Sequence, residues 1–580
     1  MKFNLSKYFF DSIHDTRIDE ILDKTDEKYQ EFFNKYNGKL GDKDTYLSYL
    51  KESEKLNEDI YKVFIYFSLL KSIDMQNQDL IRRSAEINNR YSDISKVFTP
   101  FIDQELALSE ATFLAYSEME EFADYKNYLI NKANNLKYSL RTEIVDVLRE
   151  YLKPMGEFGS MFSQVTNSLE FDFRGQKLTR EEVSSYRESQ DESERKDAVY
   201  SVANVYNNEQ LQLMYSHIYA ALCKENVADI KVKKFTTVME SSNISEEMDN
   251  EVVDTLIDSV VSYYPIFHKY LKVKAKALGK EKLQIWDVLA PIQYEESEIP
   301  FVKGFDMLLN VLEDFDTEFR DYANDMLEGE RVDVYPAKSK RNGAFAQYAK
   351  DIESFVLLNY TNRLSDVFTL AHEFGHAFHG HLSQVQNTYN YNSSLCLAET
   401  ASIFTETILF DNIYKKLDKE DKNYYLFSRL DDYFSTIFRQ IMYTCFERRC
   451  HQSFLDGKKL THDDLNDIWF EESSKLYGDS VVLNKELMGY GWSSIPHIFN
   501  SPFYCYSYAF SNLLSLNLYN IYQSEENKED FVDMFKNILK SGGKLRPSEL
   551  LAQNGFDISK KEFYTFGLDY IDELIDNIEL

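Results

Sequence analysis

His372-Glu373-Phe374-Gly375-His376 is the stretch around which this chain is organised. In a helix, residues four apart lie one turn apart on the same face, so both histidines can reach one metal ion. Two imidazoles suit Zn²⁺, which lowers the pKa of a bound water towards neutrality. The carboxylate of Glu373 can then take the proton that hydrolysis must move. The pattern therefore predicts a metal-dependent hydrolase, although so short a motif also occurs by chance on surface helices.

The residues before the motif predict a buried strand that leads into the motif helix. Residues 354–360 form an apolar run typical of such a strand. Apolar side chains then recur at helical spacing from residue 367 to residue 378. We expect Ser365 or Asp366 to cap this helix.

Short strands are predicted at residues 332–334, 343–348 and 355–360, with a turn at 338–343. Gly343 and Ala344 are expected to begin an edge strand beside the metal. Their small side chains would let an extended peptide approach and pair with the strand backbone. An ordinary hairpin would show the same pattern.

Glu399 is the better candidate for the third metal ligand, since a catalytic zinc usually has three protein ligands and one open position. It lies in a predicted second helix, with Ser402 and Glu406 on the same face. Carboxylates in an otherwise apolar helix need partners if they are buried. The metal would be the partner of Glu399, and Glu406 could accept a hydrogen bond from a histidine ring. His379 is the other candidate ligand, and a solvated helix face is the plain alternative for the charged stripe.

Residues 489–508 are rich in Gly, Tyr and Pro, unlike the helical background. His497 and a nearby tyrosine could donate hydrogen bonds to the oxyanion of a tetrahedral intermediate. Tyr504 and Tyr508 share a face if the segment is helical, and Tyr506 joins them if it is extended. Ordinary aromatic packing is the alternative for each of them.

The composition of the 580 residues favours a mainly helical protein, because it contains only 9 Pro and 19 Gly. The net charge of −32 argues against nucleic acid and anionic membranes as partners, and solubility is its plain explanation. The first residues lack the apolar core of a secretory signal. The five cysteines lack zinc-ribbon or redox spacing, which fits reduced thiols in a cytoplasmic protein.

Local patterns predict helices at residues 46–56, 59–71 and 102–150, with a break at Thr99-Pro100 and a stop at residues 153–156. A hairpin is expected at residues 170–177. Thr179 and Glu182 have the spacing of a capping box that opens another helix.

Taken together, these motifs resemble the M3 family of zinc metallopeptidases, in particular its oligoendopeptidase F branch. The resemblance spans roughly residue 110 to the C-terminus. It implies a mainly α, two-lobed fold with a deep central channel and a small β-sheet beside the zinc helix. It also implies a catalytic domain at residues 191–580, after an N-terminal helical region at 1–110 and an oligoendopeptidase F-type helical domain at 111–190.

The resemblance carries the family's site onto matching positions of this sequence. It implies one zinc ion held by His372, His376 and Glu399, with Glu373 as general base. Glu406 and His379 would support the ligands. Transition-state contacts would come from His497 and a tyrosine, of which we favour Tyr508, and substrate contacts from Gly343, Ala344, Tyr504 and Tyr506.

The resulting hypothesis is a cytoplasmic zinc endopeptidase that acts on short oligopeptides. A zinc carboxypeptidase or dipeptidyl carboxypeptidase is the alternative within hydrolases, and would need a cation to hold a free C-terminal carboxylate. A non-catalytic peptide-binding protein is the alternative from another class, but it would not need Glu373. Cleavage preference, oligomeric state and the identity of the divalent ion stay open.

Overall fold

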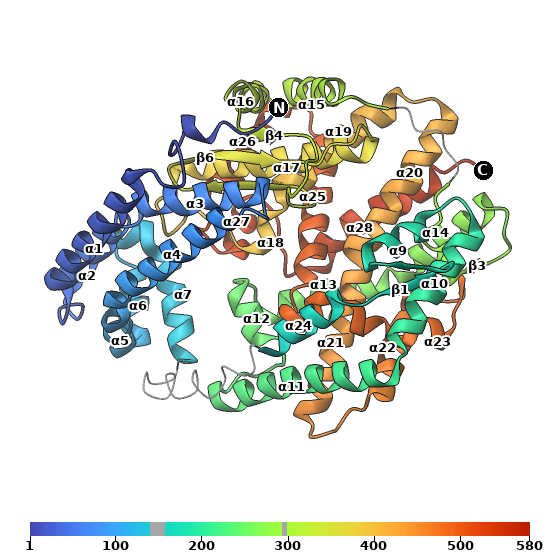
Figure 1. The fold of residues 1–580 in the computed structure, drawn as a ribbon, viewed down its shortest axis with the longest axis horizontal. Helices are drawn as coiled ribbons and strands as arrows, with labels where there is room; N and C mark the ends of the chain where they lie inside the picture. The colour runs from blue at the N-terminus through green and yellow to red at the C-terminus, as the bar shows by residue number, and fades with distance from the viewer. Residues whose placement is uncertain (140–156, 293–297) are drawn as a thin grey trace. The chain divides into compact units, whose positions relative to one another are not determined.

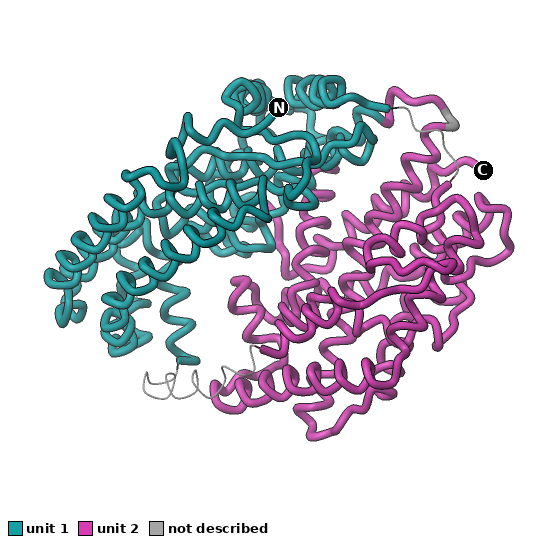
Figure 2. Tube along the Cα trace, in the orientation of Figure 1, with its two compact units in different colours: residues 1–139, 296–413, 521–554 teal, residues 140–295, 414–520, 555–580 magenta. Residues whose placement is uncertain are grey.

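The computed structural model describes residues 1–139, 157–292 and 298–580. Most of these residues are helical, and the strands form three small sheets (Figure 1). The predicted mainly α class is confirmed. The chain divides into two compact units that each combine three segments (Figure 2). Unit 1 comprises residues 1–139, 296–413 and 521–554, and unit 2 comprises residues 140–295, 414–520 and 555–580.

Unit 1 contains the N-terminal helices, a three-stranded sheet and the helix with the histidine motif. Its α-helices are α1 Thr16–Tyr36, α2 Lys43–Ser53, α3 Glu58–Ile73, α4 Gln78–Ser95, α5 Thr99–Ala107, α6 Glu110–Ser117, α7 Lys126–Lys137, α15 Phe301–Phe315, α16 Thr317–Glu328, α17 Leu364–Leu382, α18 Leu395–Ala398, α19 Thr400–Lys416, α26 Lys528–Lys540 and α27 Pro547–Gln553. Its strands are β4 Val332–Asp333, β5 Phe345–Ala349 and β6 Ile352–Leu357.

Unit 2 is also built mainly from helices and contains two two-stranded sheets. Its α-helices are α9 Arg180–Ser185, α10 Glu192–Tyr206, α11 Glu209–Lys233, α12 Glu240–Ser245, α13 Asn250–Ser262, α14 Tyr264–Ala277, α20 Lys419–Tyr433, α21 Arg439–Leu455, α22 His462–Tyr477, α23 Lys485–Met488, α24 Pro496–Asn500, α25 Tyr506–Ser524 and α28 Lys561–Asp576. Its strands are β1 Phe171–Phe173, β2 Gln176–Leu178, β3 Leu283–Gln284 and β7 Val481–Val482.

The predicted N-terminal helices are present with small shifts of their ends, as α2 and α3. Thr99-Pro100 starts α5 and does not simply break the pattern, because Pro lacks only an N–H that a first helical turn leaves unpaired. The predicted helix from residue 102 is divided among α5, α6 and α7. Its continuation to residue 150 and the predicted stop at 153–156 fall outside the described residues. None of the described helices is long and apolar enough to cross a bilayer.

The predicted hairpin at residues 170–177 is confirmed as β1 and β2, which pair antiparallel. Arg174 and Gly175 form its turn with φ values of 52° and 85°, the positive angles that a two-residue hairpin turn requires. The capping box is confirmed too. Thr179 Oγ1 accepts the N–H of Glu182, and Glu182 Oε2 accepts the N–H of Thr179 at 2.7 Å.

The sheet of unit 1 has the order β4-β6-β5, with β6 parallel to β4 and antiparallel to β5. The ring of Phe355 on β6 packs against Phe3 and Phe9 of the N-terminal segment. Ser354 donates a hydrogen bond to the carbonyl of Ala377 on α17. The strand is buried from Ser354 to Leu357, where Phe355, Val356 and Leu357 form an apolar run, whereas Glu353 is exposed. The predicted small sheet beside the motif helix is therefore present (Figure 1).

Candidate active site

The motif helix α17 begins at Leu364, earlier than predicted. Asp366 lies in its first turn and is not the N-cap residue. Its Oδ2 accepts the backbone N–H groups of Thr361 at 2.6 Å and Arg363 at 3.0 Å. Asp366 therefore stabilises the helix start from inside the first turn, where a negative charge is favourable.

Helices α17 and α19 approach each other closely at Gly375. A Cβ at this position would lie 2.4 Å from the Cα of Ser402 and 2.5 Å from the carbonyl oxygen of Ala401. Only glycine allows the two backbones to meet. This contact brings Glu399, which directly precedes α19, to the histidine face of α17.

We predict that Gly375→Ala lowers both thermal stability and zinc content. Alanine is the better helix former, but its methyl group would collide with backbone atoms, and overpacking costs about 1–3 kcal/mol. Separating the helices would also move Glu399 away from the histidines. Thermal unfolding and metal analysis check this. Gly41→Ala is the matched control, because a Cβ there meets nothing within 4 Å. Wild-type melting and zinc content in Gly375→Ala would contradict the prediction.

His372, His376 and Glu399 converge, with ligand atoms that all lie within 4.8 Å of one another. Glu399 Oε2 lies 3.3 Å from His372 Nε2 and 3.2 Å from His376 Nε2. Two imidazole nitrogens and one carboxylate form the donor set of a catalytic zinc site that keeps a fourth position open. Helical spacing predicted that the two histidines could face one metal ion, and Glu399 was the preferred candidate for the third ligand.

Two further side chains, those of Ser402 and Glu406, contact the candidate ligands. Ser402 Oγ donates a hydrogen bond to Glu399 Oε2 at 2.8 Å. Glu406 Oε2 lies 3.4 Å from Nδ1 of His372, on the ring edge opposite the one that faces Glu399. A carboxylate in this position fixes the orientation and tautomer of a ligand imidazole. Glu406 thus lies where the sequence pattern placed it.

The electrostatic environment of His372, His376 and Glu399 favours a positive charge at this site. Burial opposes protonation of His372, but hydrogen bonds to Glu399 and Glu406 outweigh it and raise its pKa to about 10. Burial likewise opposes ionisation of Glu399, yet hydrogen bonds from His372 and His376 hold its pKa well below the usual range. A divalent cation would be favoured in place of the imidazole protons. Protons should therefore compete with the metal as the pH falls.

Glu373 lies beside the first histidine and is 7% exposed. Burial raises the pKa of its carboxyl group, although the two histidines oppose this. A hydrogen bond with the backbone of Ala346 ties Glu373 to strand β5. A buried carboxylate with a raised pKa is well suited to take up a proton during hydrolysis.

His379 is buried one turn beyond His376 and does not belong to the converging group. Burial lowers its pKa to about 4, so the ring is neutral near pH 7. Its ring hydrogen-bonds to the backbone of Ala398, the residue before Glu399. His379 is thus placed to support the segment that presents Glu399.

Tyr348 is a site residue that sequence reasoning missed. It lies on β5, and its ring packs over Gly380, where a Cβ would come within 2.5 Å of it. Burial raises the pKa of Tyr348 to about 12, with further contributions from Glu399 and Glu373. Its phenol therefore lies near both carboxylates. The available signal was Gly380 inside a helical pattern, which often marks a close approach.

The predicted strand at residues 343–348 begins later, at Phe345. Gly343 has a φ of +77°, a left-handed conformation that keeps it out of the ladder. Its carbonyl accepts a hydrogen bond from Asn359 Nδ2 at 2.7 Å. The prediction that Gly343 and Ala344 form part of the edge strand is therefore wrong, whereas β5 itself does lie at the sheet edge.

In unit 2, His497 and two of the three tyrosines form an aromatic group. The ring of Tyr504 stacks on His497 at 5.6 Å with an interplanar angle of 7°. Tyr508 meets both rings edge-on, at 5.0 Å from Tyr504 and 5.9 Å from His497. Tyr506 is 0% exposed, so a direct contact between this ring and a substrate is not supported.

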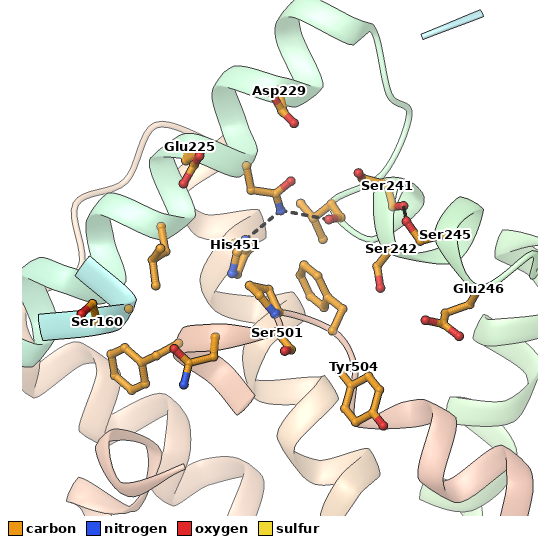
Figure 3. A pocket seen from close by; sticks show the side chains of 18 residues that line it. Ser160, Glu225, Asp229, Ser241, Ser242, Ser245, Glu246, His451, Ser501 and Tyr504 are labelled. Atoms are coloured by element: carbon orange, nitrogen blue, oxygen red, sulfur yellow. Dashed lines mark hydrogen bonds between the residues drawn. The ribbon is translucent and has the colours of Figure 1, made fainter. Parts of the chain in front are cut away.

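Tyr504 also borders a cavity of about 700 Å³ within unit 2 (Figure 3). His451 lies in its wall, where Nδ1 accepts a hydrogen bond from Asn226 Nδ2 at 2.8 Å. The same amide nitrogen donates to the carbonyl of Val238, which fixes the amide orientation. The carboxyl groups along the cavity come from Glu225, Asp229 and Glu246.

Comparison with known proteins gives a consistent picture. The family model described as Peptidase family M3 matches residues 185–568. Oligopeptidase PepF of Bacillus subtilis is 26% identical, over 94% of this chain and 82% of the relative. An oligoendopeptidase F homolog of Borreliella burgdorferi is 29% identical, over 91% of this chain and 90% of the relative.

Solved structures share the fold. One from Chlamydophila abortus covers 100% of this chain and 97% of its own, with a TM-score of 0.85 and 23% identity. Oligoendopeptidase F from Enterococcus faecium covers 97% of this chain and 99% of its own, with a TM-score of 0.70 and 22% identity.

Proposed function

The chain belongs to peptidase family M3, and from this premise we propose that it is a zinc-dependent endopeptidase that hydrolyses internal bonds of short oligopeptides. The observation that carries the proposal is the convergence of His372, His376 and Glu399 beside the buried carboxyl group of Glu373. Relatives named as oligopeptidases along nearly the whole chain support the substrate class.

Zinc is the proposed metal, held by His372, His376 and Glu399, because their two nitrogens and one carboxylate fit its preferred ligands. When bound, zinc acts as a Lewis acid and lowers the pKa of a coordinated water. Glu373 accepts the proton of the attacking water and delivers it to the leaving amine. Glu406 holds the His372 ring in the orientation that this arrangement needs.

His497 and Tyr508 are proposed to donate hydrogen bonds to the oxyanion that forms when water attacks the peptide carbonyl. Their mutual ring contact and their packing with Tyr504 support a shared role. Tyr508 is preferred to Tyr506 because Tyr508 is only partly buried, whereas Tyr506 is fully buried.

We predict that Tyr508→Phe lowers kcat by about 100–1,000-fold and leaves KM nearly unchanged. The oxyanion exists only on the reaction path, so loss of its donor spares substrate binding. Phenylalanine keeps the ring contacts, and zinc content should stay constant. Steady-state kinetics with Tyr504→Phe and Tyr506→Phe alongside decide between the tyrosines. Normal kcat in all three variants would remove this segment from the mechanism.

A carboxypeptidase or dipeptidyl carboxypeptidase is the second candidate activity. Mass spectrometry of the products separates it from an endopeptidase. An endopeptidase cuts a peptide whose C-terminus is amidated at an internal bond, whereas an enzyme that requires a free C-terminal carboxylate leaves that peptide intact.

Several finer features belong to the same proposal. They include the deep channel that admits short peptides, the domain limits at residues 110 and 190, the substrate contacts of Gly343, Ala344 and Tyr504, and a cytoplasmic location. A series of peptides of increasing length tests the channel. Cleavage should fall off with length and be absent for folded proteins.

A further inference from the structure

Three arginines of unit 2 line one small cavity of about 90 Å³. Arg180 begins α9, Arg187 lies in the 3₁₀ turn that follows it, and Arg439 begins α21. The cavity wall contains no Asp or Glu side chain. Arg180 and Arg187 lie seven residues apart, whereas Arg439 comes from a distant part of the sequence. No sequence motif predicts that the three meet.

None of these three guanidinium groups forms an ion pair within 4.0 Å to any carboxylate among the described residues. Arg180 instead faces the rings of Phe171 and Tyr206, and its buried Nη1 has no hydrogen-bond partner there. The chain has 97 acidic and 65 basic residues, so carboxylates are not scarce. The lack of a counter-charge at this cavity is therefore not due to a shortage of carboxylates in the chain.

The charges of Arg180 and Arg439 act on Arg187, whereas the pKa of Arg439 is raised, mainly by Tyr443. Burial lowers the pKa of Arg187, and the positive charges of Arg180 and Arg439 lower it further, against the opposing effect of Tyr490. Partly buried like charges without a counter-ion cost free energy. An anion between them would remove both the repulsion and the desolvation penalty.

The cavity selects for a small anion. Guanidinium groups bind anions through several N–H donors at once, and the phenols of Tyr477 and Tyr490 in the same wall add hydroxyl donors. The available space of about 90 Å³ is enough for one small ion.

The cavity also touches the segment that leads to His497. Tyr490, Gly491 and Ser494 of the 3₁₀ helix Gly489–Ser494 line it, together with Ile495. Ile495 is the N-cap residue of α24, and His497 is the second residue of that helix. An ion in this cavity would therefore contact the backbone segment that sets the position of His497.

We propose that this cavity binds a small inorganic anion of about the size of chloride, and that the bound anion holds the segment 489–495 and so positions His497. The first half concerns binding and stands by itself. The second half rests on the proposed role of His497 in peptide hydrolysis.

Thermal unfolding tests the binding half. The melting temperature of the wild-type protein should rise with sodium chloride relative to sodium gluconate at equal ionic strength, since gluconate is too large for the cavity. In crystals soaked with bromide, an anomalous peak should lie between the three arginines. Equal melting in both salts, or no bromide peak in the cavity, would overturn the proposal.

Arg187→Gln separates an anion site from a merely structural arginine. Loss of one charged donor should raise the chloride concentration at half-effect about tenfold or more. At very low chloride the variant should melt at the same temperature as wild type or higher, because it carries less unpaired charge. At high chloride wild type should be the more stable. Destabilisation of Arg187→Gln by the same amount at every chloride concentration would make Arg187 structural and overturn the proposal.

Arg448→Gln is the matched control. Arg448 lies on α21, the helix that begins with Arg439, and pairs with Asp254 at 2.8 Å outside the cavity. This variant should keep the full chloride dependence of the wild type. A lost chloride response in Arg448→Gln would show that the effect does not come from the cavity.

Kinetics test the second half with a peptide that carries an amidated C-terminus. Chloride should raise kcat in wild type and have little effect in Arg187→Gln. If chloride raises the melting temperature and bromide binds in the cavity, but kcat does not depend on chloride, the link to His497 is overturned and the anion site remains supported. If chloride only raises KM, and only for peptides with a free carboxylate, the cavity holds the substrate C-terminus and the inorganic anion is overturned.

Discussion

Glu373→Gln is expected to keep its zinc and to lose peptide hydrolysis. Positioned acid–base groups contribute about 100–10,000-fold, so kcat should fall within that range. The amide has nearly the shape of the carboxylate but cannot accept a proton. Glu373 does not belong to the converging ligand group, so the metal site should be intact. Zinc content and hydrolysis are measured on the same preparation.

The control for this variant is Glu328→Gln, at the exposed end of α16 in the same unit. It makes the same chemical change away from the site and should be fully active. More than a few per cent of wild-type kcat in Glu373→Gln would exclude Glu373 as the base. Loss of zinc in that variant would instead give Glu373 a part in holding the metal.

Glu399→Ala is expected to lose zinc, because it removes the one carboxylate that contacts both ligand histidines. Activity should fall to background for that reason. Glu406→Ala should weaken zinc binding only about 10–100-fold, since its carboxylate supports His372 from behind. Zinc affinities measured by competition with a chelator separate the two effects.

Wild-type zinc affinity in Glu399→Ala would contradict the proposed ligand set. His379 would then be the first residue to examine, because its ring lies next to the backbone that presents Glu399. Equal losses in Glu399→Ala and Glu406→Ala would show that Glu406 binds the metal directly.

Helical periodicity in the sequence was sufficient to predict the part of the site that is carried by helices. Helical spacing placed His372 and His376 on one face of α17. This relation follows from backbone periodicity, which the sequence displays directly. The capping box at Thr179 was predictable for the same reason. The predicted continuous helix through Glu399 was wrong: Ser402 and Glu406 lie on α19, but Glu399 lies in the turn between α18 and α19.

Features that depend on how elements pack were not predictable. Gly375 matters because a second helix backbone meets it, and Tyr348 enters the site because β5 packs on α17. The strand start at Phe345 was misplaced because nothing in the pattern required a left-handed conformation at Gly343. The arginine cavity of unit 2 depends on tertiary structure, since Arg439 is distant in sequence from Arg180 and Arg187.

Cleavage of an internally quenched peptide with both ends blocked tests the central claim most directly. We expect wild-type protein to cut it at an internal bond, to stop when a chelator removes the metal, and to recover when zinc is restored. Cleavage only of peptides with a free C-terminus would contradict an endopeptidase. Cleavage that a chelator leaves unchanged would contradict the zinc mechanism, and binding without cleavage would contradict an enzyme altogether.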